Sequence, residues 1–136
     1  MFQESPELAS VGKSFIVQEF IPHEEFLKIF VIGKEIFVFK RKVERMKDGE
    51  ITRPKISCVS AREVVLSNDL SRRLQMIATS ISSIFKFELF GFDVIESGEQ
   101  LFVVDVNYFP TFKELGGEKF RQLLDQYCKY LVRDSN

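Results

Sequence analysis

The chain has 136 residues, of which 45% are hydrophobic, so it is long enough for one globular core and too short for two. Its 19 Lys and Arg side chains are balanced by 20 Asp and Glu, which excludes the strong positive field of a general nucleic-acid or membrane-surface binder. The composition therefore predicts a single soluble domain with no nucleic-acid and no membrane partner.

The same sequence predicts a cytoplasmic location. Cys58 and Cys128 form neither a metal-binding pattern nor a disulfide framework, which favours a reducing compartment. No apolar run approaches the roughly 18 residues of a membrane-spanning helix. The start at Met1–Pro6 does not have the pattern of a signal peptide.

The first half of the chain is predicted to be rich in strands. Residues 1–13 are polar and are predicted to be loose. Three strand-like runs follow, at Phe15–Phe20, Phe26–Ile32 and Glu35–Lys42. The turn signal Gly33-Lys34 joins the last two into a hairpin. Residues 44–56 are charged and contain the turn signal Asp48-Gly49, so we expect a mobile loop of the kind that often covers a ligand.

The second half is predicted to be two helices around a pair of strands. Apolar residues recur at helical spacing between Asn68 and Lys86, with Asn68 or Asp69 as the N-cap. Strands at Leu89–Glu96 and Gln100–Asn107 follow, and then a helix at Glu118–Val132. This order predicts an α+β fold, a single unit over residues 14–136, with a largely antiparallel sheet and helices packed on one face.

The last predicted strand ends in two side chains that carry oxygen donors, Asp105 and Asn107. Because strand residues alternate between faces, both should share a face with Leu101 and Val103. Carboxylate and amide oxygens suit Mg²⁺, which commonly links carboxylates to substrate phosphates. Since Asp and Asn are also common turn residues, simple termination of the strand before Pro110 is the alternative interpretation.

A third oxygen ligand, Asp93, joins that face only if the hairpin register allows it. A two-residue loop at Ser97-Gly98 would place Asp93 on the wrong face. A three-residue loop at Ser97–Glu99 would place it opposite Val103 and diagonal to Asp105. The metal-site hypothesis therefore predicts an odd-numbered loop or a β-bulge, and a simple two-residue hairpin would count against it.

Five short sequence segments between residues 14 and 132 are informative when they are taken together in their order along the chain. They are Gln18-Glu19-Phe20-Ile21-Pro22-His23, Lys28–Gly33, Lys40-Arg41-Lys42, Phe90–Ile95 and Asp105-Val106-Asn107-Tyr108-Phe109-Pro110. Together they resemble the ATP-grasp inositol phosphate kinases, most closely the inositol trisphosphate 5/6-kinase family, also called inositol tetrakisphosphate 1-kinase. The resemblance implies the C-terminal portion of an ATP-grasp fold. It also implies transfer of the γ-phosphate of ATP to a hydroxyl of an inositol polyphosphate, with these two molecules as partners.

The resemblance implies a nucleotide site with several contacts. The hinge that holds adenine through backbone groups would consist of Gln18, Glu19, Phe20 and Ile21. Lys28 and Arg41 would be the catalytic cations at the phosphates, and Ser60 would lie near the nucleotide. Because phosphoryl transfer mainly needs alignment and neutralised charge, such cations beside metal-binding carboxylates would serve it well. Without the resemblance, solvated strand residues would be the simpler interpretation of Lys28 and Arg41.

The resemblance also implies a metal and substrate site. Asp93, Asp105 and Asn107 would coordinate two Mg²⁺ ions between the β- and γ-phosphates of ATP. Asn107, Lys28 and the loop residue His23 would contact the inositol phosphate. Thr111 stands where the family usually has Gly, so its side chain would narrow the substrate pocket or change the substrate.

The resemblance begins in the middle of the family pattern, which implies one wall of a nucleotide cleft and little or no activity for this chain alone. Two other functions stay open: an ATP-grasp ligase that activates a carboxylate as an acyl phosphate, and a noncatalytic nucleotide-binding or interaction domain. Ligases of this fold more often carry Glu at the position of Asp105. An exposed apolar cleft wall would also favour a homodimer through the open cleft face.

Overall fold

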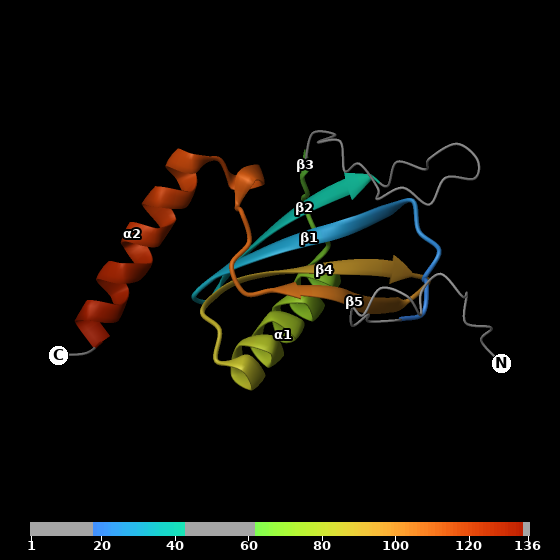
Figure 1. The fold of residues 1–136 in the computed structure, drawn as a ribbon, viewed down its shortest axis with the longest axis horizontal. Helices are drawn as coiled ribbons and strands as arrows, with labels where there is room; N and C mark the ends of the chain where they lie inside the picture. Colours follow the sequence, from blue (N-terminus) through green and yellow to red (C-terminus); the bar gives the residue numbers. More distant parts are fainter. Residues whose placement is uncertain (1–17, 43–61, 135–136) are drawn as a thin grey trace, which may run out of the picture.

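The computed structural model of the chain describes residues 18–42 and 62–134, and in these ranges five strands form one antiparallel sheet (Figure 1). The strand order across the sheet is β3-β2-β1-β4-β5. The strands are β1 (Glu25–Ile32), β2 (Glu35–Lys42), β3 (Arg62–Glu63), β4 (Leu89–Ser97) and β5 (Gln100–Asn107). The helices are α1 (Asn68–Phe85), the short 3₁₀ helix η1 (Lys113–Leu115) and α2 (Gly117–Asp134).

The predicted α+β class and antiparallel sheet are confirmed, and one predicted strand is wrong in its described part. Gln18–Phe20 have no strand conformation, because all three side chains are exposed and no buried face holds them in a ladder. The remainder of that predicted strand, residues 1–13 and the predicted loop 44–56 lie outside the described residues. The two-residue strand β3 is too short to produce a sequence pattern.

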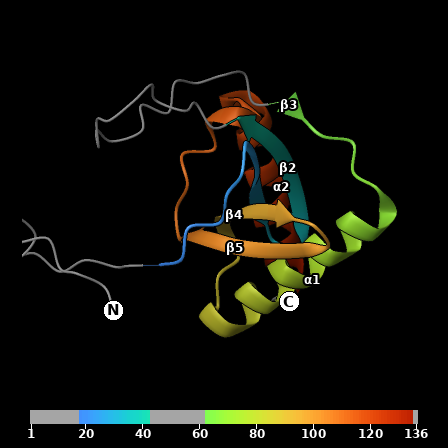
Figure 2. The same ribbon diagram turned by 90° about the vertical axis from the view of Figure 1, so that its right-hand side faces the viewer.

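Helix α1 covers one face of the sheet, as Figure 2 shows from the side. Its buried residues Leu74, Ala78 and Ile81 follow helical spacing and meet the inward side chains of three strands. The main core on this face comprises Leu27, Ile29, Val31, Val38, Leu74, Ala78, Ile81, Phe90, Phe92 and Val94. None of the described helices is apolar enough over a sufficient length to cross a membrane.

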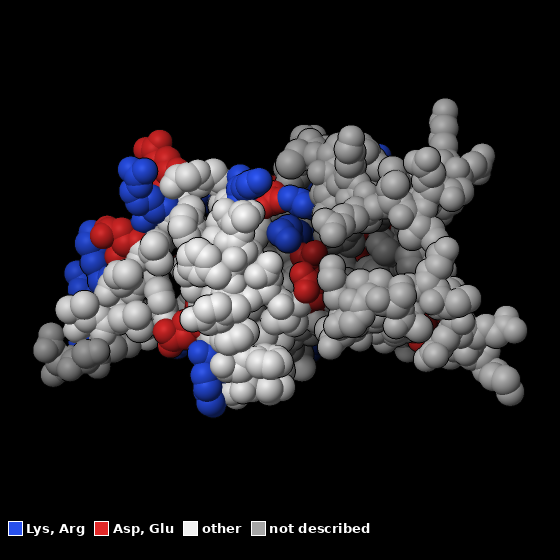
Figure 3. Space-filling view, viewed as in Figure 1, with Lys and Arg blue, Asp and Glu red and all other residues white. Residues whose placement is uncertain are grey.

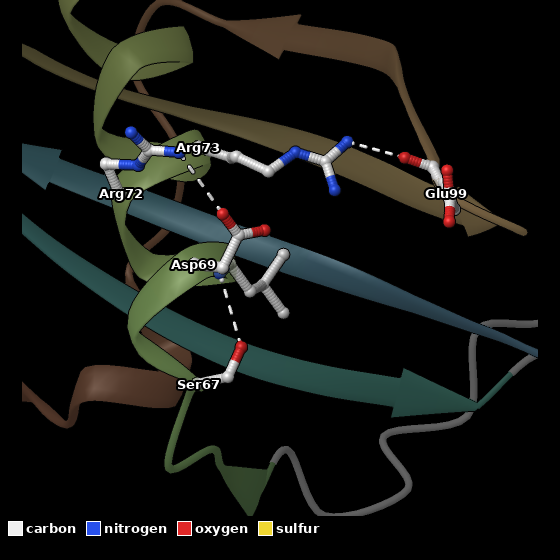
Figure 4. A network of polar contacts seen from close by, with 6 residues as sticks. Ser67, Asp69, Arg72, Arg73 and Glu99 are labelled. Carbon is white, nitrogen blue, oxygen red and sulfur yellow. Dashed lines mark hydrogen bonds and ion pairs between the residues drawn. The ribbon is translucent and has the colours of Figure 1, made fainter.

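Polar contacts at the start of α1 fix it against the turn between β4 and β5 (Figure 4). Ser67, one residue before the N-cap predicted from sequence, accepts a hydrogen bond from the backbone N–H of Leu70 (3.3 Å). Arg73 reaches across the sheet and donates to the carbonyl oxygen of Glu99 (2.7 Å). Arg72 and Asp69 pair on the exposed side of the first turn (3.3 Å). The β4–β5 hairpin is therefore held to the helix at its tip.

The opposite face of the sheet carries a second core, so the prediction that both helices pack on one face is wrong. This core comprises Phe30, Ile32, Phe39, Phe112 and Leu115, with Phe120, Leu123 and Tyr127 packed against it. The central strand β1 buries apolar side chains on both of its faces, and both therefore need cover. Helices η1 and α2 supply that cover on the second face.

Candidate functional site

Three charged side chains stand in one row across the sheet. Lys28 of β1 is the register partner of Asp93 of β4, and Asp93 is in turn the register partner of Asp105 of β5. Residues directly opposite each other on neighbouring strands point to the same face. Asn107, which is opposite Gly91, lies two residues further along β5 on that face. The row lies on the face that also carries Phe30 and Phe39.

A β-bulge in β5 brings the two carboxylates together. Ser97 pairs with Gln100, so the hairpin loop is the two-residue Gly98-Glu99, and the three-residue loop predicted from sequence is wrong. The alternative prediction, a bulge, is confirmed by a register shift between Asp93 and Val94 that leaves Val104 without a partner in the ladder.

The bulge also corrects the predicted facing of β5. Val103 is opposite Val94, which belongs to the core under α1, whereas Asp105 is opposite Asp93 on the other face. Leu101 also packs against the core under α1. Asp105 and Asn107 therefore do not share a face with Leu101 and Val103, because the extra residue reverses the alternation.

The row of Lys28, Asp93 and Asp105 combines two carboxylates with one nearby cation. The Nζ of Lys28 donates to Oδ1 of Asp93 at 3.3 Å, and the two side chains are 16% and 19% exposed. Burial raises the pKa of Asp93, and the charge of Asp105 adds to this effect. Lys28 and Arg41 act in the opposite direction and lower the pKa of Asp93. The row therefore holds more negative charge than its own lysine neutralises.

Arg41 of β2 forms an ion pair with Glu114 of η1 on the same side of the sheet. Their side chains are 15% and 4% exposed, so the pair is largely shielded from water. Figure 3 shows the acidic and basic side chains adjoining one another over the sheet. Glu114 was not among the residues predicted from sequence, because it belongs to no motif and its partner is distant in the chain.

A small cavity brings the predicted adenine hinge next to Asp93. It has a volume of about 210 Å³ and is lined by Gln18, Glu19, Phe20, Ile21, His23, Phe26, Asp93, Ile95 and Val104. The Nδ1 of His23 donates a hydrogen bond to the carbonyl oxygen of Ile21 (2.6 Å), since a carbonyl can only accept. The rings of Phe20 and Phe26 lie 5.9 and 6.4 Å from that of His23. His23 therefore belongs to the hinge wall of the cavity.

Two further predicted residues lie apart from this cavity, and one is not described. Asn107 and Thr111 are exposed and do not line it. Ser60 lies outside the described residues. The metal role of Asp93, Asp105 and Asn107 stays a prediction, and so do the contacts of Lys28 and Arg41 with phosphate.

The donor set of the row fits Mg²⁺ better than a metal that needs a full protein cage. Among the described residues, no three His, Cys, Asp or Glu side chains are grouped so that they could hold a metal ion. Two facing carboxylates and one neighbouring amide remain, Asp93, Asp105 and Asn107. Mg²⁺ is usually bound in this way, through one or two carboxylates, with water and phosphate oxygens completing the octahedron.

Comparison with known proteins finds a family whose model matches most of the chain. The model of the inositol 1,3,4-trisphosphate 5/6-kinase ATP-grasp domain matches residues 2–129. Inositol-tetrakisphosphate 1-kinase 6 of Oryza sativa is 29% identical over 126 residues, which covers 78% of this chain and 23% of the relative. Inositol hexakisphosphate and diphosphoinositol-pentakisphosphate kinase 2 of Xenopus laevis is 30% identical over 112 residues, covering 80% and 10%. The chain thus spans a quarter or less of the curated relatives it matches.

Solved structures show the same fold at lower sequence identity. A RiPP-associated ATP-grasp ligase of Chryseobacterium gregarium, in complex with ADP and a leader and core peptide, superposes with a TM-score of 0.56 at 15% identity. The macrocyclase MdnC of Microcystis aeruginosa, bound to its precursor peptide MdnA, gives 0.51 at 19% identity. They cover 79% and 83% of this chain, and each match spans 34% of the solved chain. The sheet and helices are therefore those of an ATP-grasp fold.

Proposed function

Because the chain belongs to the inositol 1,3,4-trisphosphate 5/6-kinase ATP-grasp family, we propose that it carries the metal- and phosphate-binding portion of an inositol phosphate kinase. The family resemblance of the sequence is thereby confirmed. The proposed reaction is Mg²⁺-dependent transfer of the γ-phosphate of ATP to a hydroxyl of an inositol polyphosphate. The row of Lys28, Asp93 and Asp105 is the observation that carries this proposal.

Asp93, Asp105 and Asn107 are the proposed metal ligands. Two Mg²⁺ ions held there would neutralise the β- and γ-phosphates of ATP. The facing carboxylates of Asp93 and Asp105 repel each other in the chain alone, and the raised pKa of Asp93 reflects this repulsion in part. A divalent cation between them would relieve it, so the geometry favours metal binding over a purely structural role.

Lys28 and Arg41 are the proposed phosphate-binding cations. Lys28 lies within hydrogen-bonding distance of Asp93, so its ammonium group is held beside the proposed metal site. Arg41 acts electrostatically on Asp93 from the neighbouring part of the sheet. Cations in fixed positions stabilise the charge that develops on a transferring phosphoryl group without reorganising during the step.

The hinge segment is the proposed adenine-binding wall. The cavity between Gln18–Ile21 and Asp93, about 210 Å³, is smaller than typical ligand pockets, which occupy roughly 300–1,000 Å³. It therefore suits the base of a nucleotide with the phosphates extending toward the row of Lys28 and Asp93. We assign His23 to the hinge wall as well as to the predicted substrate contact, because it holds the carbonyl of Ile21.

The proposed location, ligands and oligomeric state of the chain follow from the same proposed function. We place it in the cytoplasm, with ATP and an inositol polyphosphate as ligands. Phe20 lines the cavity while 76% exposed, so one wall of the cleft presents apolar surface. A second copy of the chain packed on this open cleft face is the homodimer that we propose.

The carboxylate ligase remains the alternative that the shared fold allows, since one of the two solved neighbours is an ATP-grasp ligase by its name and the other is a macrocyclase. The Asp105-x-Asn107-x-Phe109-Pro110 segment favours the kinase, because it is part of the family resemblance. A noncatalytic nucleotide-binding domain would keep the cavity and the metal ligands but show no turnover.

A calorimetric titration with ATP, with and without Mg²⁺, tests the shared core of these functions. We expect Mg²⁺-dependent binding that weakens at least about tenfold in Asp105→Asn, or 1.4 kcal/mol. Asp125→Asn on α2 makes the same chemical change at an exposed site and should bind like the native chain. Absence of Mg²⁺-dependent binding by the native chain would contradict the proposal. Phosphorylation of an inositol phosphate would identify the kinase, whereas absence of turnover would not exclude it, because the resemblance implies little or no activity for this chain alone.

A further inference from the structure

Both proposed phosphate-binding cations, Lys28 and Arg41, already have a carboxylate partner within the protein. Lys28 pairs with Asp93 inside the sheet, and Arg41 pairs with Glu114. Glu114 is the least exposed of these four side chains, at 4%, and it comes from η1. The pairing of Arg41 is therefore made by an element that lies outside the sheet.

The position of Glu114 is fixed by its neighbours in sequence. Phe112 and Leu115, on either side of it, are 3% and 6% exposed and belong to the second core. The ring of Phe112 lies 4.4 Å from that of Phe120 and 5.0 Å from that of Phe30. Since η1 cannot move without uncovering these apolar groups, the carboxylate of Glu114 is held at Arg41 by the packing of the core.

The pair changes the charge that the face offers to a ligand. Two cations, Lys28 and Arg41, lie with three carboxylates, those of Asp93, Asp105 and Glu114. A guanidinium binds carboxylate and phosphate through the same N–H groups, often in the same bidentate geometry. The Nε of Arg41 and both carboxylate oxygens of Glu114 are buried, so a phosphate group at Arg41 must compete with a carboxylate already in contact with it.

We propose that Glu114 is a specificity-determining residue that selects against highly phosphorylated anions by occupying the guanidinium of Arg41. The inference rests on the proposed function, because it assigns Arg41 to the phosphate side of the site. It identifies the favoured ligands as phosphate-bearing molecules of lower charge, because a ligand that depends strongly on Arg41 must first displace the carboxylate of Glu114. Free polyphosphates are then bound weakly.

Inorganic tripolyphosphate titrated calorimetrically into the full chain, without Mg²⁺ and at low ionic strength, tests this inference. Glu114→Gln is expected to bind it at least threefold more tightly than the native chain. The same substitution in an Arg41→Gln background should give no gain, because the effect acts through Arg41. Glu118→Gln, which removes the same charge from an exposed position of α2, is the matched control and should leave the affinity within twofold of native.

Unchanged or weaker binding by Glu114→Gln overturns the inference, as does a gain that persists in the Arg41→Gln background. If Glu114→Gln does not fold, Glu114→Asp takes its place, because it withdraws the carboxylate from Arg41 by one methylene. Glu114→Asp should also bind tripolyphosphate more tightly than the native chain. An unchanged affinity in Glu114→Asp overturns the inference too. The titration omits Mg²⁺, so it does not depend on the metal ligands. Absence of Mg²⁺-dependent ATP binding by the native chain would instead count against the proposed function.

Discussion

Asp93 of β4 and Asp105 of β5 are direct register partners, so two carboxylates face each other across neighbouring strands. Like charges in this position ordinarily weaken a sheet. Burial raises the pKa of Asp93, and the nearby charge of Asp105 raises it further, although Lys28 opposes both effects. We therefore expect the arrangement to lower the stability of the chain alone and to favour a bound cation.

The first prediction concerns this repulsion. Asp105→Asn should stabilise the chain without Mg²⁺ by about 0.5–1 kcal/mol, because it removes one of two facing charges. Thermal unfolding without metal should show a higher Tm for Asp105→Asn than for the native chain. Added Mg²⁺ should raise the Tm of the native chain but not that of the variant. Asp125→Asn serves as the exposed control. A lower Tm for Asp105→Asn without metal would contradict the prediction.

The second prediction concerns the cation of the row. Lys28→Met leaves the largely buried Asp93 without its close partner, so we expect a loss of about 1–3 kcal/mol near neutral pH. An Asp whose pKa is raised by folding adds stability below its ordinary pKa, which is lost as pH rises through the raised value. Removing Lys28 raises that pKa further.

Urea denaturation near neutral pH and again near pH 3, below the ordinary pKa of Asp at about 3.9, measures this effect. The loss in Lys28→Met should be clearly smaller at the acidic pH, where Asp93 is protonated. Lys34→Met changes an exposed lysine in the β1–β2 turn and should cost little at either pH. An equal loss for Lys28→Met at both values would show that packing, not charge, is responsible.

The third prediction concerns the close contact that positions the end of β5. A Cβ at Gly91 would lie 3.0 Å from Cγ of the buried Pro110 and 3.2 Å from the carbonyl oxygen of Ile29. Gly91→Ala should therefore destabilise the chain by about 1–3 kcal/mol, as overpacking does in other cores. Gly117→Ala, where a Cβ meets open space, is the control. Equal denaturation midpoints for the two variants would refute this account.

The fourth prediction concerns Tyr127 of α2, whose hydroxyl donates to the Glu88 carboxylate at 2.5 Å. Burial raises the pKa of this phenol, and the hydrogen bond and charge of Glu88 raise it further. A raised phenol pKa adds stability below the ordinary value of about 10, and this is lost as pH rises through the raised value.

Tyr127→Phe should consequently cost about 0.5–1.5 kcal/mol at neutral pH and flatten the alkaline decline in stability. Denaturant unfolding at neutral pH and above pH of about 10 would show this. Tyr108→Phe, at an exposed position, should behave as native at neutral pH. An alkaline decline that is unchanged in Tyr127→Phe would assign it to other groups.

The sequence pattern predicted those parts of the fold that depend on local preferences. The β1–β2 hairpin follows from alternating apolar runs around Gly33, and α1 from apolar residues at helical spacing. The helix α2 could be predicted in the same way, but the face of the sheet on which it packs could not. Strand β1 is apolar on both faces, and local periodicity does not indicate which helix covers which face.

The candidate site could be predicted in part for a similar reason. Asp105 and Asn107 stand out because they end an apolar strand, and Asp93 because it follows Gly91 inside one. The relative positions of these side chains depend on whether the extra residue of the hairpin lies in its loop or as a bulge in β5. The sequence is compatible with both. The contact between Arg41 and Glu114 joins elements distant in the chain, so no local pattern indicates it.

The bulge at Val104 has a consequence for association as well as for the site. Within the described sheet β5 is an outer strand, and outer strands offer unpaired backbone groups to which another chain can add. A bulge twists and interrupts such an edge, so it is a poor template for a further strand. The inserted residue that turns Asp105 toward Asp93 therefore also protects the molecule from edge-to-edge aggregation.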